Sequence, residues 1–271
     1  MKQDRISGAA EIEEKAIGDI KKYVGRDGLF ERCYELLSAY PSMASLWNIA
    51  NLAFLYGKDA IKQFNRMAKA NERIIEHGAS VIKDNATVLT YSRSSTVSRI
   101  LRACESKNIR AICSESRPKY EGRKLVRELC ESNVDTIFTT DISLFSYVGK
   151  ADMILMGTDA ILKKGTINKI GTAALASHAK GTGKDVYMAS SSHKAFPFVF
   201  IKEEGRKEIW QDSPDKVKVK NFYFDFTPVR HVDYFITEKG VSRAKPIFRH
   251  EVANEILEIK DKFECRYRLV E

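Results

Sequence analysis

Apolar residues recur at two different spacings along the chain, and the change comes near residue 85. Before that point they return every three or four positions, as in Ile17, Ile20 and Val24, which is the spacing of one helix face. Pro41-Ser42 should open a third helix with Ser42 as its N-cap, and residues 59–83 predict one long helix with a charged outer face. The first 84 residues therefore predict a helical domain.

After residue 85, short β-branched runs alternate with segments of helical period. The strand candidates are 87–90, 110–113, 136–139, 153–156, 186–189 and 234–236. The helical segments between them are 96–106, 122–131, 142–148 and 171–180. This alternation predicts right-handed crossovers and a mostly parallel, doubly wound sheet. The expected fold class is α/β, with an N-terminal helical domain over 1–84 and a Rossmann-like domain over 85–271.

Polar residues follow the core strands at the points where they end. The loops are 91–95, 114–117, 140–141, 157–159 and 190–194. Ligands of open parallel sheets bind beyond the carboxyl ends of the strands, and the hydroxyls and amides of Ser92-Arg93-Ser94 suit a phosphate oxyanion at a helix start. Alternatively, such residues only cap the helices that follow. Five loops at one sheet edge favour a polar ligand site.

Charge and composition narrow the class of ligand. The 271 residues carry a formal net charge of +9, which favours a phosphorylated ligand, nucleic acid or an acidic partner. The basic residues are interleaved with acids and form no recognised nucleic-acid motif, so we do not expect direct nucleic-acid binding. The five cysteines are scattered, which indicates reduced thiols and no metal site. No run is long and apolar enough for a membrane span or signal peptide, so we expect a cytoplasmic protein without membrane contact.

The most specific pattern is Gly157-Thr158-Asp159-Ala160, followed after a spacer by GTINKIGT at 165–172. It resembles the GADxxxxxGxxxNKxGT pattern of a superfamily with two branches. One branch comprises the alpha, beta and delta regulatory subunits of translation initiation factor 2B. The other comprises isomerases of methylthioribose 1-phosphate and ribose 1,5-bisphosphate. Further blocks that resemble the family in the same order are SGAA at 7–10, PSMASL at 41–46, 90–96, 115–122, SHK at 192–194 and FDFTP at 224–228.

The resemblance implies a site for a phosphorylated small molecule. The implied ligand-binding residues are Gly8, Ala9, Ser92, Arg93, Ser94, Asp159, Asn168, Lys169 and Lys194. In the isomerases, a cysteine of the first loop and the aspartate of the Gly-Ala-Asp block form the acid/base pair. Here Ser92 stands at the cysteine position and Asp159 is retained. A serine hydroxyl without a strong base does not lose its proton near neutral pH.

This chain departs from the isomerase pattern at two positions where the isomerases contact phosphate. Ser7 and Tyr40 stand where the isomerases have basic residues, and each missing charge-assisted contact weakens binding by about 1.5–3 kcal/mol. The first-loop sequence is closer to the initiation-factor branch, and an archaeal-type alpha-like subunit is the favoured assignment.

Two hypotheses follow from this resemblance. The first is a non-catalytic regulatory subunit that binds a sugar phosphate or nucleotide, assembles into a homo-dimer or higher oligomer, and has translation initiation factor 2 as a candidate partner. The second is a divergent aldose–ketose sugar-phosphate isomerase with Asp159 as its catalytic residue. No cofactor is expected, since no GxGxxG follows the first strand. A structural alternative remains for Asp159, Asn168 and Lys169, namely an internal network around a tight turn.

Two further segments have predicted structural roles. The phenylalanines at 196, 198 and 200 and at 222, 224 and 226 alternate at period two, which predicts core or dimer-interface strands. Residues 202–220, called the excursion below, are charged and irregular and are expected on the surface.

Overall fold

The computed structural model describes residues 9–243 and 251–271. Its N-terminal part is helical, as predicted: α1 (Ala9–Ile20), α2 (Leu29–Ala39), α3 (Ala44–Tyr56) and α4 (Ala60–Val81). The predicted N-cap is wrong, because Met43 precedes α3 without a side-chain cap and the Ser42 hydroxyl donates to the Phe200 carbonyl at 2.7 Å. Ser42 therefore joins the helical part to a strand far away in the sequence.

In the described residues, seven strands form a central sheet in the order β11-β10-β7-β4-β1-β2-β3. Their bounds are β1 (Thr87–Leu89), β2 (Arg110–Ser114), β3 (Asp135–Thr139), β4 (Met153–Gly157), β7 (Val186–Ala189), β10 (Tyr234–Thr237) and β11 (Gly240–Ser242). Neighbours pair in parallel except β10 and β11. The mostly parallel sheet is thus confirmed. The chain leaves β3 at one edge and returns to β4 beside β1, so the loops after β1 and β4 lie at the topological switch point.

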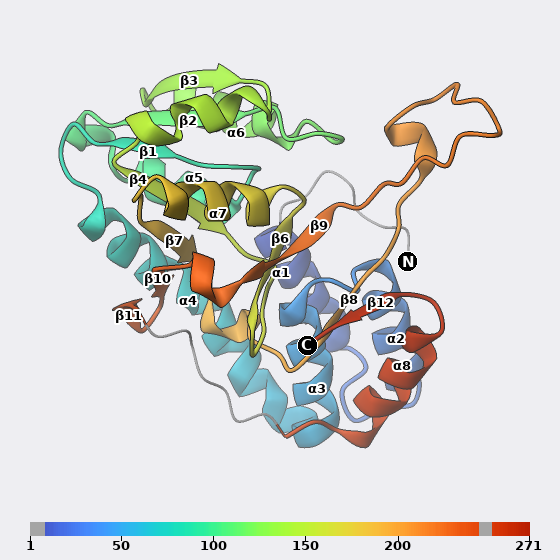
Figure 1. The fold of residues 1–271 in the computed structure, drawn as a ribbon. Helices are drawn as coiled ribbons and strands as arrows, with labels where there is room; N and C mark the ends of the chain where they lie inside the picture. The colour runs from blue at the N-terminus through green and yellow to red at the C-terminus, as the bar shows by residue number, and fades with distance from the viewer. Residues whose placement is uncertain (1–8, 244–250) are drawn as a thin grey trace.

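Helices cover both faces of this sheet (Figure 1). They are α5 (Ser95–Arg102), α6 (Glu121–Cys130), α7 (Thr172–Gly181) and the 3₁₀ segment η3 (Ser143–Lys150), where the sequence predicted an ordinary helix. Val88 packs in one core with residues of α4, α5 and α6. Its neighbour Leu89 packs in another core with residues of η3 and α7. The alternation along β1 is the period of a strand buried on both sides.

A third core joins the N-terminal helices to segments from the second half of the chain. These segments include β5 (Ala160–Ile161), β6 (Gly165–Lys169), β8 (Val199–Ile201), β9 (Phe224–Pro228), α8 (Asn254–Glu264) and β12 (Arg268–Val270). Trp47 of α3 lies at its centre, with the rings of Phe196, Phe198, Phe200 and Phe263 at centroid distances of 5.2 to 6.1 Å. The phenylalanines at 196–200 are therefore core residues, one of the two predicted roles.

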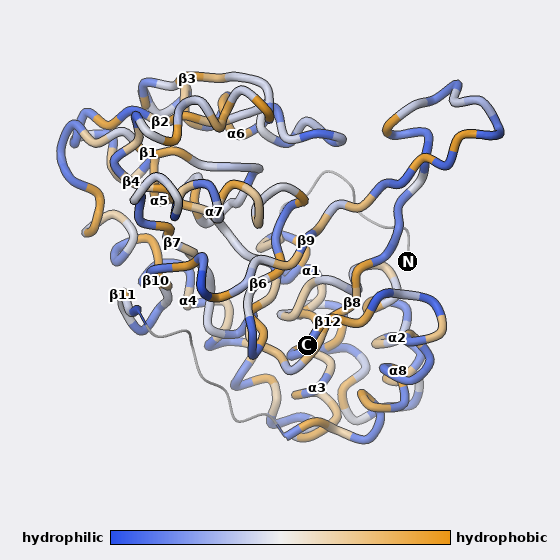
Figure 2. Tube along the Cα trace, in the orientation of Figure 1, coloured by the Kyte–Doolittle hydropathy of each residue, from blue (hydrophilic) through white to orange (hydrophobic). Residues whose placement is uncertain are grey.

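The excursion projects from the body of the molecule and is coloured orange in Figure 1. It contains the short segment η5 (Arg206–Glu208) and exposes half of the Trp210 surface (50%). Hydrophilic and hydrophobic residues mix along it, whereas hydrophobic residues line the interior of the helical part (Figure 2). Within the described ranges, no helix combines the length and apolarity of a membrane span.

Candidate functional site

A cavity of about 600 Å³ lies where the loops after β1 and β4 meet the N-terminal helices and α6. Among the predicted ligand-binding residues, those that line it are Ala9, Ser92, Arg93, Ser94, Asp159, Asn168, Lys169 and Lys194. Gly8 and Ser7 lie outside the described residues. Tyr40 also lines the cavity. The fold therefore gathers at one place residues that are as much as 185 positions apart, from Ala9 to Lys194.

The loop after β1 is shaped by Ser92 and Ser94. Ser92 adopts a left-handed backbone conformation with φ of 64°, and Ser94 caps α5 by accepting from the Val97 N–H at 3.4 Å. Gly157 at the end of β4 makes room for this cap, since a Cβ there would lie 2.5 Å from the Ser94 hydroxyl oxygen. The glycine of the Gly-Thr-Asp block thus allows two loops of the site to touch.

Asp159 lies on the same β4 loop, with its backbone fixed on both sides. Its N–H donates to the Ile167 carbonyl at 2.8 Å, and its carbonyl accepts from the Ala44 N–H at 3.0 Å. Burial raises the pKa of the Asp159 carboxyl, while Lys194 and Lys169 act against that increase. A carboxyl in this environment retains its proton at higher pH and can donate it to a ligand.

Lys194 and Lys169 are the two buried cations near Asp159. Lys194 is 9% exposed, and its ammonium group donates to the Thr158 carbonyl at 2.8 Å. Asn48 of α3 fixes the Lys194 loop by donating to the carbonyls of His193 and Ala195, each at 2.6 Å. The Lys169 ammonium instead donates to both carboxylate oxygens of Glu121 at 2.8 and 3.0 Å.

Arg93 and Asn168 line the cavity but are already engaged with other side chains. The Arg93 guanidinium pairs with Glu128 at 2.7 Å and with Glu11 at 3.6 Å, so its charge is balanced by carboxylates. The Asn168 amide donates to the Thr172 hydroxyl at 3.1 Å. A ligand that uses either side chain must compete with these contacts.

Sequence reasoning missed the cationic side of the cavity that α6 and the loop before it provide. Additional lining residues are Lys119, Tyr120, Glu121, Arg123, Lys124, Arg127, Lys202, Glu204 and Tyr223. A signal was present, since four basic residues at 119, 123, 124 and 127 recur at helical spacing after the second strand. In the described part of the chain, eight basic and three acidic side chains line the cavity. This imbalance attracts anions.

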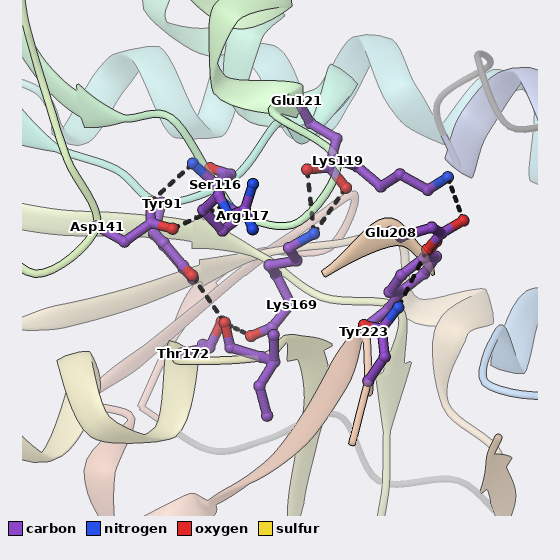
Figure 3. A network of polar contacts seen from close by, with 12 residues as sticks. Tyr91, Ser116, Arg117, Lys119, Glu121, Asp141, Lys169, Thr172, Glu208 and Tyr223 are labelled. Atoms are coloured by element: carbon purple, nitrogen blue, oxygen red, sulfur yellow. Dashed lines mark hydrogen bonds and ion pairs between the residues drawn. The ribbon is translucent and has the colours of Figure 1, made fainter. Parts of the chain in front are cut away.

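A polar network joins several of these residues (Figure 3). Two ammonium groups lie near the Tyr223 ring, that of Lys119 at 5.5 Å and that of Lys169 at 5.3 Å from its centroid. Both distances suit cation–π attraction. Deeper in the site, Tyr91 donates to the Ile170 carbonyl at 2.7 Å, which fixes the first loop against the turn after β6.

The thiols lie elsewhere. No cysteine is among the described residues that line the cavity. Burial raises the pKa of both Cys33 and Cys113 to about 12, which keeps these thiols protonated at neutral pH. Within the described ranges, no group of three or more His, Cys, Asp and Glu side chains is arranged to hold a metal ion.

Residues 29–244 match the model of the initiation factor 2 subunit family. The chain belongs to that family. Among similar members, a translation initiation factor eIF-2B subunit 2-like protein of Pyrococcus horikoshii is 30% identical over 259 residues, covering 89% of this chain and 93% of that protein. A ribose 1,5-bisphosphate isomerase of Archaeoglobus fulgidus is 28% identical over 265 residues, covering 87% and 85%. Proteins named as initiation-factor subunits and proteins named as isomerases are thus both similar to this chain.

The solved structures agree with the family assignment. The P. horikoshii translation initiation factor eIF-2B structure has a TM-score of 0.78 at 29% identity, covering 88% of this chain and 92% of that one. The 5-methylthioribose 1-phosphate isomerase of P. horikoshii has a TM-score of 0.65 at 21% identity, covering 96% and 85%. The second likeness establishes the shared fold alone.

Proposed function

We propose that this initiation factor 2 subunit family member binds a phosphorylated small molecule in the cavity and acts as a regulatory subunit that does not isomerise it. The observation that carries the proposal is a partly buried Asp159 within the electrostatic reach of Lys169 and Lys194, in a cavity whose described lining contains no thiol. The two ammonium groups supply charge for a phosphoryl group, at about 1.5–3 kcal/mol for each charge-assisted contact.

A sugar phosphate is the proposed ligand class. Two relatives in sequence or fold are named as isomerases of ribose 1,5-bisphosphate and 5-methylthioribose 1-phosphate. The cavity volume of about 600 Å³ lies in the usual range for small-molecule sites. Hydroxyls of Ser92 and Ser94 at its wall supply hydrogen-bonding groups for a sugar.

The chemistry of aldose–ketose isomerisation supports the non-catalytic assignment. The reaction moves a proton between neighbouring carbons, which requires a base that is ionised near neutral pH. The Ser92 hydroxyl meets this requirement only with a strong base beside it. Asp159 with its raised pKa can supply a proton, but the thiolate of the isomerase pair has no counterpart at Ser92.

Isomerisation by Asp159 is the second candidate. The raised pKa of this carboxyl favours it, because a carboxyl whose pKa is raised is better suited to act as a general acid or base. The similarity to ribose 1,5-bisphosphate isomerases of several archaea also supports it.

One experiment separates the two candidates. The purified protein is incubated with ribose 1,5-bisphosphate or methylthioribose 1-phosphate, and thermal stability and ketose formation are both measured. We expect a higher Tm without product, because a ligand that binds the folded state stabilises it by mass action. Lys194→Met should remove most of the Tm increase. Ketose production abolished by Asp159→Asn would establish the isomerase, and unchanged Tm with both compounds would exclude this ligand class.

We also propose that the chain works as a homo-dimer or higher oligomer and contacts translation initiation factor 2. The support is the family: one neighbour in fold is described as a tetrameric eIF2B-beta2-delta2 complex. An exposed apolar surface at the edge of the sheet is consistent with assembly, since Phe138 and Ile142 are 43% and 79% exposed.

A further inference from the structure

The excursion begins with Lys202 and Glu204, which line the cavity, and it contacts the cavity wall again through the carboxylate of Glu208. Lys119 donates to one carboxylate oxygen at 2.7 Å. Asn221 donates to the other at 3.1 Å, and the Tyr223 hydroxyl donates to that same oxygen. The Glu208 side chain is 17% exposed and that of Lys119 is 24% exposed, so this is a sheltered ion pair and not a loose surface contact.

Glu208 itself is not among the residues that line the cavity, but two of its partners are. Lys119 and Tyr223 both line it, and the Tyr223 ring also contacts the ammonium of Lys169, the cation paired with Glu121. Figure 3 shows these side chains near one another, with dashed lines that join Lys169 to Glu121 and Glu208 to Lys119 and Tyr223. A second contact lies beside the first, where Arg117 donates to the Ile209 carbonyl at 3.5 Å.

The carboxylate is ionised at neutral pH. Burial by itself raises the pKa of Glu208, but hydrogen bonds from Lys119 and Tyr223 outweigh it and leave the pKa below its usual range. Three donors on one carboxylate fix the positions of the donors as well as that of the acceptor.

We propose that Glu208 is a positioning residue of the cavity, which holds Lys119 and Tyr223 in place for an anionic group of the ligand and ties the excursion to that site. This inference rests on the proposed binding of a phosphorylated ligand. Lysine has a long flexible side chain, and one that is already fixed loses less freedom when a ligand binds. The same contacts connect the cavity to the exposed surface around Trp210, two residues after Glu208.

Two substitutions separate positioning from a simple charge effect. Glu208→Asp keeps the negative charge but shortens the side chain by one methylene, so that Lys119 and Tyr223 lose their common acceptor. Glu208→Gln removes the charge but keeps an oxygen that accepts from Tyr223. The matched control is Glu203→Gln on the same excursion, because Glu203 pairs with Lys220 at 2.8 Å and lies outside the cavity lining.

The affinity for ribose 1,5-bisphosphate is measured by calorimetry for each variant. We expect Glu208→Asp to weaken binding about fivefold. Lys119 and Tyr223 are then no longer held in place, and the ligand must order them when it binds. This loss should be smaller in a Lys119→Met background, where only the contact between Glu208 and Tyr223 remains to be lost. Glu203→Gln should bind like the wild type. Normal affinity of Glu208→Asp together with tighter binding of Glu208→Gln would mean that Glu208 is only a counter-ion, and would overturn the proposal.

A measurement without ligand keeps this inference separate from the proposed function. The chain has two tryptophans, of which Trp47 is fully buried and Trp210 is half exposed, so acrylamide quenching, with Trp210→Phe as the reference, reports the excursion. Glu208→Asp and Lys119→Met should both increase quenching of Trp210, whereas Glu203→Gln should not. If the wild type binds no sugar phosphate, the proposed function fails. Unchanged quenching in Glu208→Asp and Lys119→Met would overturn the role of Glu208 independently.

Discussion

Asp159 and Asp225 lie near the cavity, and both have a raised carboxyl pKa that the sequence alone does not reveal. Both residues are partly buried, and the loss of contact with water disfavours the ionised form of each carboxyl group. Asp225 accepts from the backbone N–H groups of Gly171 at 2.7 Å and Ala173 at 3.4 Å, at the start of α7. These bonds offset only part of the burial, and the pKa of Asp225 rises to about 6.

This raised pKa predicts a dependence of stability on pH. The folded protein holds the Asp225 proton more tightly than the unfolded chain, whose ordinary value is 3.8. The resulting stabilisation is complete below about pH 4 and is lost as the pH rises through about 6. A shift of this size corresponds to about 3 kcal/mol. Asp225→Asn should lack this component. Between pH 4 and pH 7 the free energy of unfolding of the wild type should therefore fall relative to that of Asp225→Asn.

Urea unfolding of both proteins across that range measures the difference. Asp215→Asn is the control, because the Asp215 side chain is 99% exposed. Parallel stability curves for wild type and Asp225→Asn would contradict the prediction.

At the scale of elements, the long periodic segments were predictable and the short ones were not. The strands at β1, β2, β3, β4, β7 and β10 follow β-branched runs of the sequence. Strand β5 has only two residues, too few to show a period, and it forms because β6 provides a pairing partner. Ser42 illustrates the same limit: its sequence context predicts a cap, but in the fold Met43 is the residue before α3 and the Ser42 hydroxyl donates to the Phe200 carbonyl.

The contact between the β1 and β4 loops gives the prediction at this scale. Gly157→Ala would place a methyl group 2.5 Å from the Ser94 hydroxyl, which should displace the cap of α5. We expect a loss of about 1–2 kcal/mol in the free energy of unfolding, the usual effect of losing an N-cap or of overpacking. Denaturant unfolding measures it. Gly149→Ala is the control, since a Cβ at Gly149 meets nothing within 4 Å, and equal stability of the two variants would refute the steric argument.

At the scale of the whole molecule, the sheet ends at β3 with an unpaired edge in the described structure. Phe138 on that strand and Ile142 just after it expose apolar surface, which proteins normally cover or protect with charge. This edge is our candidate for the proposed contact between copies of the chain. Phe138→Glu should then lower the oligomeric state or weaken assembly at least about tenfold, as expected for loss of a central aromatic residue.

Sedimentation velocity over a range of protein concentrations provides the measurement. Leu257→Glu is the matched control, because Leu257 is also 43% exposed but lies on α8. The same oligomer with Phe138→Glu as with the wild type would exclude this edge as the contact.

The sequence by itself determined the α/β class, the helical start, the order of the long strands and the loops at their ends, because helical and strand periods are local properties of the chain. It also carried the Gly-Thr-Asp and Asn-Lys-x-Gly-Thr blocks, through which the family is recognisable. Only the tertiary structure decided that α6 forms a basic wall, that Arg93 is occupied by Glu128, and that Glu208 of the excursion holds Lys119. Those pairings join residues 35 and 89 positions apart. They depend on how the helices and loops pack in space, and no local spacing encodes that.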